Sequence, residues 1–313
     1  MYFKQIRNER CGCASYLIAS RQTREAAVVD PAHTTGEYDT LLRERGFTLR
    51  YVIDTHLHAD HISGARQLAA AHGADLCLHE FAVVTYPFLP LQDNMELTLG
   101  QLRLRVLHTH GHRPELISLL IGNPARSPEP ALVLTGDSLL VGDVGRPDFG
   151  GGDAAAQHRS LTRLLGLPDW VLAFPGHFEG PCGAAMEGRP QTSIGFERRY
   201  NPLAHLDHVA FISALTASIP PRPLNMAAIE ATNRGLAEQA WAMPTAAAPI
   251  PEVAIASLVD RATWPPHPTL LDVREPAEYA LGHVPGAVNL PRPTSPRASA
   301  TSRPAPTSSS ASG

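Results

Sequence analysis

The sequence lacks the features that mark several common classes of binding protein. Only one of its 26 basic residues is a lysine, Lys4, and no run of basic residues occurs. The formal net charge is −4, so we expect no surface for nucleic acid or anionic membranes. No apolar run reaches the roughly 18–20 residues that span a bilayer. Residues 1–10 carry no apolar signal-peptide core, and we therefore expect a cytoplasmic protein.

Cysteine is also scarce. The four cysteines, Cys11, Cys13, Cys77 and Cys182, are too few and too scattered for a disulfide scaffold in 313 residues. Cys11 and Cys13 could form a thiol metal pair, although two cysteines beside a strand are more often only small residues. Hydrophobic residues make up 43% of the chain, which is enough for a core, and the length allows two domains.

Short apolar runs alternate with helical patterns over residues 1–242, which is typical of an α/β domain. We expect strands over residues 15–19, 26–29, 50–54, 76–79, 102–108, 116–121, 131–135 and 170–174. We expect helices over residues 37–45, 63–72, 154–165 and most of 203–241.

The composition changes after residue 242. Residues 243–252 are rich in Pro and Ala and indicate a linker. A second, smaller α/β pattern covers residues 253–291. Residues 292–313 contain no large apolar side chain, so we expect this tail to be disordered.

The strongest functional signal is the sequence THLHADH at residues 55–61, directly after an expected strand. It places His56, His58, Asp60 and His61 within six residues, a density of metal-binding side chains that is improbable by chance. The alternative is a polar loop that leads into a helix.

Three later side chains, His112, Asp137 and His177, each follow an expected strand and complete a set of five His and two Asp. Open α/β sheets place their sites at such strand ends. Imidazole with carboxylate, and no thiolate, suits Zn, Fe(II) or Mn better than it suits a cysteine-type structural zinc site.

These residues resemble the metallo-β-lactamase fold superfamily, whose hallmark is a T-H-x-H-x-D-H loop. The resemblance covers about residues 1–240 and implies an α/β fold, a four-layer αββα sandwich. It implies a first metal site at the positions of His56, His58 and His112. The implied second site uses Asp60, His61 and His177, and the implied bridge between the two metals is Asp137.

The same ligand positions serve two chemistries within this superfamily. Hydrolases of the glyoxalase II type use two metals, here two Zn, and a bridging hydroxide to cleave a glutathione thioester. Persulfide dioxygenases use one Fe(II), held by the residues that match His56, His112 and Asp137. In that case His58, Asp60, His61 and His177 would orient ligands, bind water or move protons around the metal.

Three segments resemble persulfide dioxygenases, particularly those fused to rhodanese modules. They are GDVGRPDF at residues 142–149, HRPELIS at residues 112–118, and residues 176–183 followed by 193–201. Two positions depart from the pattern: His110 stands in place of Pro and Arg113 in place of Thr. Both lie beside His112, so substrate preference could differ, but neither departure removes a ligand.

The resemblance therefore implies a persulfide dioxygenase that oxidises glutathione persulfide, or a related small persulfide, with O2 to sulfite and thiol in sulfide detoxification. A dinuclear thioester hydrolase and a non-catalytic sulfur-binding module are the alternatives. Arg146, Cys182 and Tyr200 are the candidates for substrate contact. Arg146 could instead form a structural ion pair, and Cys182 could be an ordinary turn residue. Members of this family often form homodimers.

Residues 270–279 and 282–291 resemble the first third of a rhodanese sulfurtransferase domain. No cysteine follows Cys182, so this segment cannot carry out rhodanese chemistry. The segment favours a sulfur substrate and a sulfurtransferase partner. We hypothesise that the tail is an out-of-frame reading of a GC-rich gene. The hypothesis fails if no other frame resumes a rhodanese pattern with a cysteine.

Overall fold

The computed structural model describes residues 1–237, except residues 10, 181, 184, 185, 187, 218, 220, 221, 223 and 224. It also describes residues 271–272, 279–280, 282–284 and 287–289. The expected linker and the expected disordered tail lie outside these residues. The chain divides into two units, residues 1–240 and 241–313.

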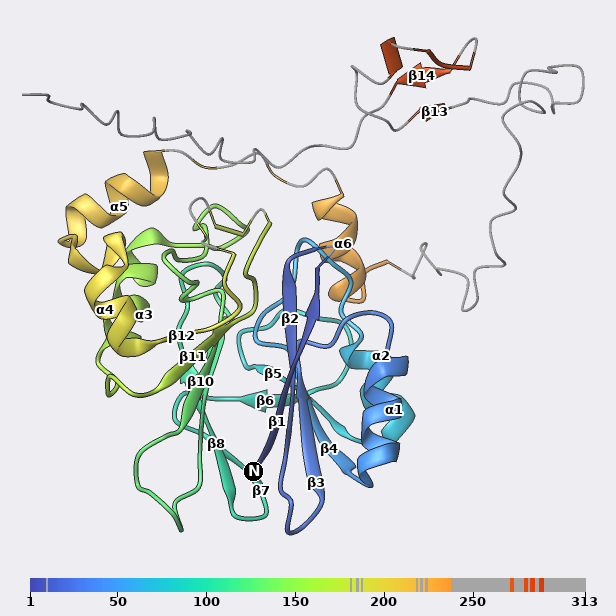
Figure 1. Ribbon diagram of the computed structural model, residues 1–313, viewed down its shortest axis with the longest axis vertical. Coiled ribbons are helices and arrows are strands. Elements are labelled where there is room, and N and C mark those ends of the chain that lie inside the picture. Colours follow the sequence, from blue (N-terminus) through green and yellow to red (C-terminus); the bar gives the residue numbers. More distant parts are fainter. Residues whose placement is uncertain are drawn as a thin grey trace, which may run out of the picture. The chain divides into compact units, whose positions relative to one another are not determined.

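Two six-stranded sheets form the centre of the first unit (Figure 1). In spatial order, the first sheet consists of β1 (Tyr2–Asn8), β2 (Cys13–Ala19), β3 (Glu25–Val29), β4 (Thr48–Ile53), β5 (Asp75–His79) and β6 (Leu89–Leu91). Strands β1 to β3 pair antiparallel, and β3 to β6 pair parallel.

The second sheet has the spatial order β12 (Thr192–Ser193), β11 (Leu172–Pro175), β10 (Leu132–Gly136), β9 (Ile117–Gly122), β8 (Leu102–His108) and β7 (Glu96–Leu99). Its pairs are antiparallel except β10 with β11, which is parallel.

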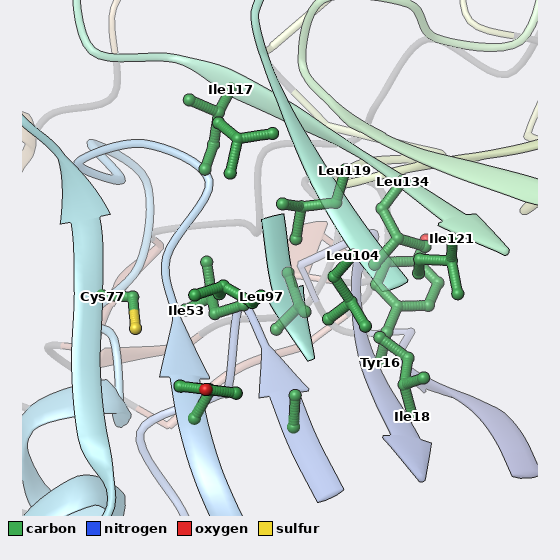
Figure 2. Packing of buried hydrophobic residues seen from close by; sticks show 14 of the residues in the cluster. Tyr16, Ile18, Ile53, Cys77, Leu97, Leu104, Ile117, Leu119, Ile121 and Leu134 are labelled. Atoms are coloured by element: carbon green, nitrogen blue, oxygen red, sulfur yellow. The ribbon is translucent and has the colours of Figure 1, made fainter. Parts of the chain in front are cut away.

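The main core lies between the two sheets. Figure 2 shows Tyr16 and Ile53 of the first sheet packed in one cluster with Leu119 and Leu134 of the second. Every residue of β2 is buried, because both faces of this strand are covered. That explains why β2 lacks the polar alternation of a strand with one solvated face.

Helices cover both outer faces (Figure 1). Helices α1 (Gly36–Arg45) and α2 (Ala65–His72) pack on the first sheet. Helices α3 (Ala154–Leu165), α4 (Ile194–Tyr200) and α5 (His208–Ala217) pack on the second. The layers are therefore helix, sheet, sheet, helix, which confirms the predicted αββα sandwich.

The long expected elements are present, with ends displaced by up to two residues. Gly46 and Gly73 end α1 and α2 in the left-handed conformation, as the sequence suggests. Strands β1, β6, β7 and β12 and helix α4 were not expected from the sequence. The expected helical region from residue 203 contains a 3-10 turn (Pro202–His205), α5 and α6 (Met226–Asn233).

In the second unit, β13 (Leu271–Asp272) pairs in parallel with β14 (Val288–Asn289). The Tyr279 hydroxyl donates a hydrogen bond to the Ala287 carbonyl at 2.6 Å. In the part of the chain that the structure describes, no helix has the length and apolar character needed to span a bilayer.

Candidate metal centre

All seven predicted ligand side chains lie in loops that directly follow strands. The loop at residues 55–61 follows β4 of the first sheet. His112 follows β8, Asp137 follows β10 and His177 follows β11, all strands of the second sheet. The candidate site is therefore built from both sheets.

His56, His112 and Asp137 form what we call the first cluster. Each offers one ligand atom, and these atoms lie within 4.8 Å of one another. The Nε2 atoms of His112 and His56 are 3.5 Å and 3.9 Å from Asp137 Oδ2. All three residues are buried. The structure thus brings together the three residues predicted to hold a single metal.

Hydrogen bonds outside the first cluster fix the tautomers of its histidines. His112 Nδ1–H donates to the Arg146 carbonyl at 2.8 Å. Thr55 Oγ1–H donates to Asp30 Oδ2 at 2.9 Å, because a carboxylate only accepts. Thr55 Oγ1 is then the acceptor for His56 Nδ1–H at 3.0 Å. Both Nε2 lone pairs consequently face Asp137.

Burial and the neighbouring His177 set the protonation states in the first cluster. It lowers the pKa of His56 well below the usual range and also lowers the pKa of His112, so both rings are neutral. Burial alone would raise the pKa of Asp137, but the charge and hydrogen bond of His177 outweigh it and the net pKa is lowered. Two neutral imidazoles and one carboxylate are a donor set ready for a divalent cation.

The second cluster consists of Cys13, Asp60, His61 and His177, whose ligand atoms also lie within 4.8 Å of one another. Its members bond mainly to one another and to Asp137. His177 Nδ1 lies 2.8 Å from Asp137 Oδ1, and its Nε2 lies 2.9 Å from Asp60 Oδ2. His61 Nδ1 lies 3.1 Å from Asp60 Oδ1. Burial opposes the charge on His177, but Asp137 raises its pKa well above the usual range.

His58 belongs to neither cluster. Its Nε2 lies 3.2 Å from Asp30 Oδ1, and it groups with Asp30 and Asp54. Burial opposes its protonation, yet the hydrogen bond to Asp30 raises the pKa of His58 to about 9. Burial raises the pKa of Asp54 to about 7. The Nδ1 atom of His58 is buried without a hydrogen-bond partner, and this atom could still serve as a ligand.

Neighbouring elements hold the histidine loop in place. On α6, Asn233 Nδ2 donates to the carbonyls of His58 and His61 at 2.8 and 2.9 Å. Glu115 accepts a hydrogen bond from the Leu57 amide at 3.0 Å. Arg113, one of the two departures from the dioxygenase pattern, is buried and pairs with Glu115 and with Glu230 of α6. Arg113 therefore helps to hold the histidine loop in place without belonging to either cluster.

The three candidates for substrate contact have different surroundings. Arg146 is 3% exposed and its guanidinium binds both oxygens of Asp148, at 2.7 and 3.0 Å, so the structure shows the ion-pair alternative. Cys182 is buried, and its sulfur lies within 4.8 Å of the ligand atoms of Asp137 and His177. Burial raises the pKa of its thiol. Tyr200 is 66% exposed and its ring contacts Phe196. No contact described for Tyr200 joins it to either cluster.

Two residues of the site, Asp30 and Thr55, have no role predicted from the sequence, and Cys13 is predicted only as an alternative. Asp30 holds both Thr55 and His58, and its only sequence signal is its place between a strand and Pro31. Thr55 is part of the recognised loop, but the loop pattern assigns it no contact. For Cys13 the sequence left open a thiol metal pair with Cys11. In the structure its sulfur lies in the second cluster and forms a disulfide with Cys11.

Comparison with known families gives two matches. The profile described as the Metallo-beta-lactamase superfamily matches residues 8–177. The profile described as a Rhodanese-like domain matches residues 256–311, past the end of the segment that the sequence resemblance identified.

Individual proteins are similar at moderate identity. "Persulfide dioxygenase ETHE1, mitochondrial" from Homo sapiens is 27% identical over 211 residues, which cover 67% of this chain and 78% of the relative. The crystal structure of ETHE1 from Myxococcus xanthus is 34% identical with a TM-score of 0.66, covering 75% of this chain and 99% of that one. A metallo-beta-lactamase structure from Staphylococcus aureus subsp. aureus COL is 27% identical with a TM-score of 0.74. The similarity covers 93% of this chain and 85% of that one.

Proposed function

The chain belongs to the metallo-beta-lactamase superfamily, and from this premise we propose that it is a persulfide dioxygenase dependent on one Fe(II). The substrate class is glutathione persulfide or a related small persulfide. Persulfide, O2 and water would give thiol and sulfite with two protons. The observation that carries the proposal is the first cluster, a preformed group of two histidines and one carboxylate. The similarity to proteins named persulfide dioxygenase supports it.

The residues of the first cluster fit Fe(II). Two imidazoles and one carboxylate are the donors of mononuclear iron oxygenases, which keep further coordination positions open. Both Nε2 atoms face Asp137 Oδ2, and the opposite ring nitrogens are engaged elsewhere. When bound, iron would supply a place for the persulfide sulfur and O2 to meet, and the electron transfer that lets O2 react.

The surrounding residues would orient and shield this centre. Thr55 and the Arg146 carbonyl keep the rings of His56 and His112 in their ligand tautomers. His177 bonds to Asp137 and is itself anchored by Asp60. Fixing a ligand through such outer contacts commonly changes metal affinity or activity 10- to 100-fold.

The contacts of His177 support one metal rather than two. Both of its ring nitrogens lie at hydrogen-bond distance from carboxylates, Nδ1 from Asp137 and Nε2 from Asp60. A two-metal site would need His177 Nε2 as a ligand, so its bond to Asp60 would have to break. The presence of all seven ligand positions nevertheless favours a second candidate, a two-zinc thioester hydrolase of the glyoxalase II type.

The rhodanese-like match supports a sulfur substrate. Rhodanese domains transfer sulfane sulfur, the same form of sulfur that a persulfide carries. We include in the proposal a role in sulfide detoxification and a sulfurtransferase as partner.

Metal analysis combined with an oxygen electrode tests the proposal on the full chain. We expect about one iron per chain and O2 uptake with glutathione persulfide. Hydrolysis of a glutathione thioester is the comparison assay. Two zinc ions per chain, thioester hydrolysis and no O2 uptake would reject the dioxygenase and support the hydrolase.

A further inference from the structure

We propose that Cys11 and Cys13 are a redox-active thiol pair that reduces the sulfane sulfur of a persulfide to sulfide, a second activity that needs neither metal nor O2. The pair lines a pocket that reaches the second cluster, and in the structure it is bonded as a disulfide. The proposal takes its substrate, a small persulfide, from the proposed function. It gives the two cysteines a chemical role of their own, separate from the metal centre.

The turn that carries the two cysteines holds them close together. Their Cα atoms are 5.3 Å apart, a separation at which a disulfide forms without moving the backbone. The amides of Cys11 and Gly12 donate to the Asn8 carbonyl at 3.3 and 2.9 Å. Gly12 has a φ of +66°, and a Cβ there would lie 2.3 Å from the Glu179 carbonyl oxygen, so only glycine fits this turn. The fixed turn keeps the two thiols within reach of each other after reduction, which favours a reaction between them.

The two sulfurs have different surroundings. Cys11 is partly exposed, whereas Cys13 is buried. Cys13 Sγ lies 3.6 Å from Asp60 Oδ2 and 3.7 Å from His61 Nδ1. The backbone of Cys13 is also held, by an isolated antiparallel bridge to His177. Because access decides which thiol a persulfide meets, we assign Cys11 as the attacking thiol and Cys13 as the resolving thiol.

The pocket gives small sulfur compounds access to the pair. Its volume of about 570 Å³ lies within the range of roughly 300–1,000 Å³ that is typical of small-molecule sites. Two carboxylates on its wall have basic partners, since Glu9 pairs with Arg7 at 3.5 Å and Glu37 with Lys4 at 3.3 Å. The third, Asp30, is engaged by hydrogen bonds inside the protein. These contacts reduce the repulsion that an anionic persulfide would meet.

The reaction consists of two thiol exchange steps. The Cys11 thiolate first attacks the outer sulfur of the persulfide. The S–S bond of the substrate breaks, its electron pair leaves on the inner sulfur, and the released thiolate takes up the proton that Cys11 lost. The Cys13 thiolate then attacks Cys11 Sγ, forms the disulfide and displaces the outer sulfur as hydrosulfide, which takes up the second proton.

Atoms and electrons balance in these steps. One persulfide and two protein thiols give one small thiol, one hydrogen sulfide and the Cys11–Cys13 disulfide. The sulfane sulfur is reduced by two electrons, and the two cysteines are oxidised by two. Two molecules of a cellular thiol such as glutathione then reduce the disulfide and leave as their own disulfide. The bonded pair in the structure is the product state of this cycle.

Sulfide release by the metal-depleted full chain tests the proposal in the absence of O2. The chain is reduced, freed of reductant and mixed with glutathione persulfide under argon. We expect a burst of about one sulfide per chain, together with the loss of the two thiols of the pair. The intact mass should fall by two hydrogen atoms. An excess of glutathione should turn the burst into continued release of sulfide.

Variants of the pair test the order of the steps. Cys11→Ser should give no burst above the spontaneous decay of the persulfide. Cys13→Ser should release no sulfide either, but its Cys11 should gain the mass of one sulfur atom, because the second step is blocked. Cys77→Ala removes a buried cysteine of β5 and is the control, which should keep the burst.

Equal sulfide release by wild type and Cys11→Ser overturns the proposal, and so does a Cys13→Ser chain whose Cys11 gains no sulfur. If Cys13→Ser fails to fold by circular dichroism, the comparison of wild type with Cys11→Ser and Cys77→Ala still decides. The assay contains neither metal nor O2, so its result is separate from that of the dioxygenase test. O2 uptake by the iron-loaded chain without a burst rejects the thiol pair alone, and a burst without O2 uptake rejects the dioxygenase alone.

Discussion

The two clusters lie side by side but satisfy their polar atoms in opposite ways. In the first, the ring nitrogens that face away from Asp137 bond to Thr55 and to the Arg146 carbonyl, which leaves both Nε2 atoms turned toward Asp137. In the second, ligand atoms bond mainly to one another, as in the contact of His177 with Asp60. The first is preorganised for a cation, whereas the second must exchange internal bonds for metal bonds.

Removing a ligand from each cluster gives the largest expected difference. His112→Ala should lose iron and reduce kcat/KM for persulfide oxidation by more than about 10³-fold, since metal ligation is worth several kcal/mol to the reaction. His61→Ala should retain about one iron per chain and lose only about 10- to 100-fold. Iron content and O2 uptake measure both.

The distinction between the two clusters would be wrong if the two variants lost activity equally. Equal losses, together with the loss of two metals in either variant, would mean that both clusters hold metal for one reaction. A circular dichroism spectrum that matches wild type is the control for folding in each case.

Adding a methyl group next to the first cluster should have a smaller effect than removing one of its ligands. A Cβ on Gly145 would lie 2.2 Å from the Asp137 carbonyl oxygen and 3.0 Å from His112 Nδ1. Gly145→Ala should therefore lower the unfolding free energy by about 1–3 kcal/mol and reduce iron occupancy. Urea unfolding of the metal-depleted protein and iron analysis of the loaded protein measure the two effects.

Gly36→Ala in α1 is the matched control, because a Cβ there meets nothing within 4 Å. It should leave iron occupancy unchanged and alter stability by less than about 1 kcal/mol. Equal behaviour of the two alanine variants would show that the first cluster tolerates displacement of its ligands.

The smallest expected effect is on the pH dependence of stability, and it concerns His79, a histidine outside both clusters. Burial lowers its pKa to about 4, and its Nδ1 accepts a hydrogen bond from the Phe81 amide, which requires the neutral ring. In the unfolded chain the pKa of His79 is about 6.5, so on acidification the unfolded chain takes up the proton before the folded one does. The stability contributed by neutral His79 is therefore complete above about pH 6.5 and is lost as the pH falls toward 4.

Unfolding of wild type and His79→Gln between pH 4 and pH 7 measures this contribution. We expect the wild type to lose about 1 kcal/mol more than the variant over that range, after allowance for solvent screening. Parallel curves would assign the acid sensitivity to other groups, including the metal ligands.

Local pattern was enough to predict the long elements and the seven candidate ligands, whereas the grouping of His56, His112 and Asp137 came from the family resemblance. The loop at residues 55–61 contains four ligand candidates in one short segment, and the strands before it and before His112 and Asp137 are long apolar runs. Most of the missed elements are short, although β1 has seven residues. Strand β12 has two residues, β6 has three, and α4 is a single polar stretch whose burial depends on the sheet below it.

The remaining contacts depend on residues far apart in the chain. His58 turns to Asp30, 28 positions earlier, because β3 and β4 are parallel neighbours whose ends meet. Cys13 reaches His177 only because the two sheets meet at that bridge. The pairing of Arg146 with Asp148 is local, two positions apart, and it was open to prediction as the ion-pair alternative.

The origin of the ligands in both sheets has a consequence for protein turnover. His56 extends from the first sheet, whereas His112 and Asp137 extend from the second, so a bound metal ties the two halves together. A ligand that binds only the folded state stabilises it by about 4 kcal/mol at a thousand times its dissociation constant. Metal depletion is therefore expected to make the chain open more often and be cleaved faster by proteases, so that limiting metal would lower its steady-state amount.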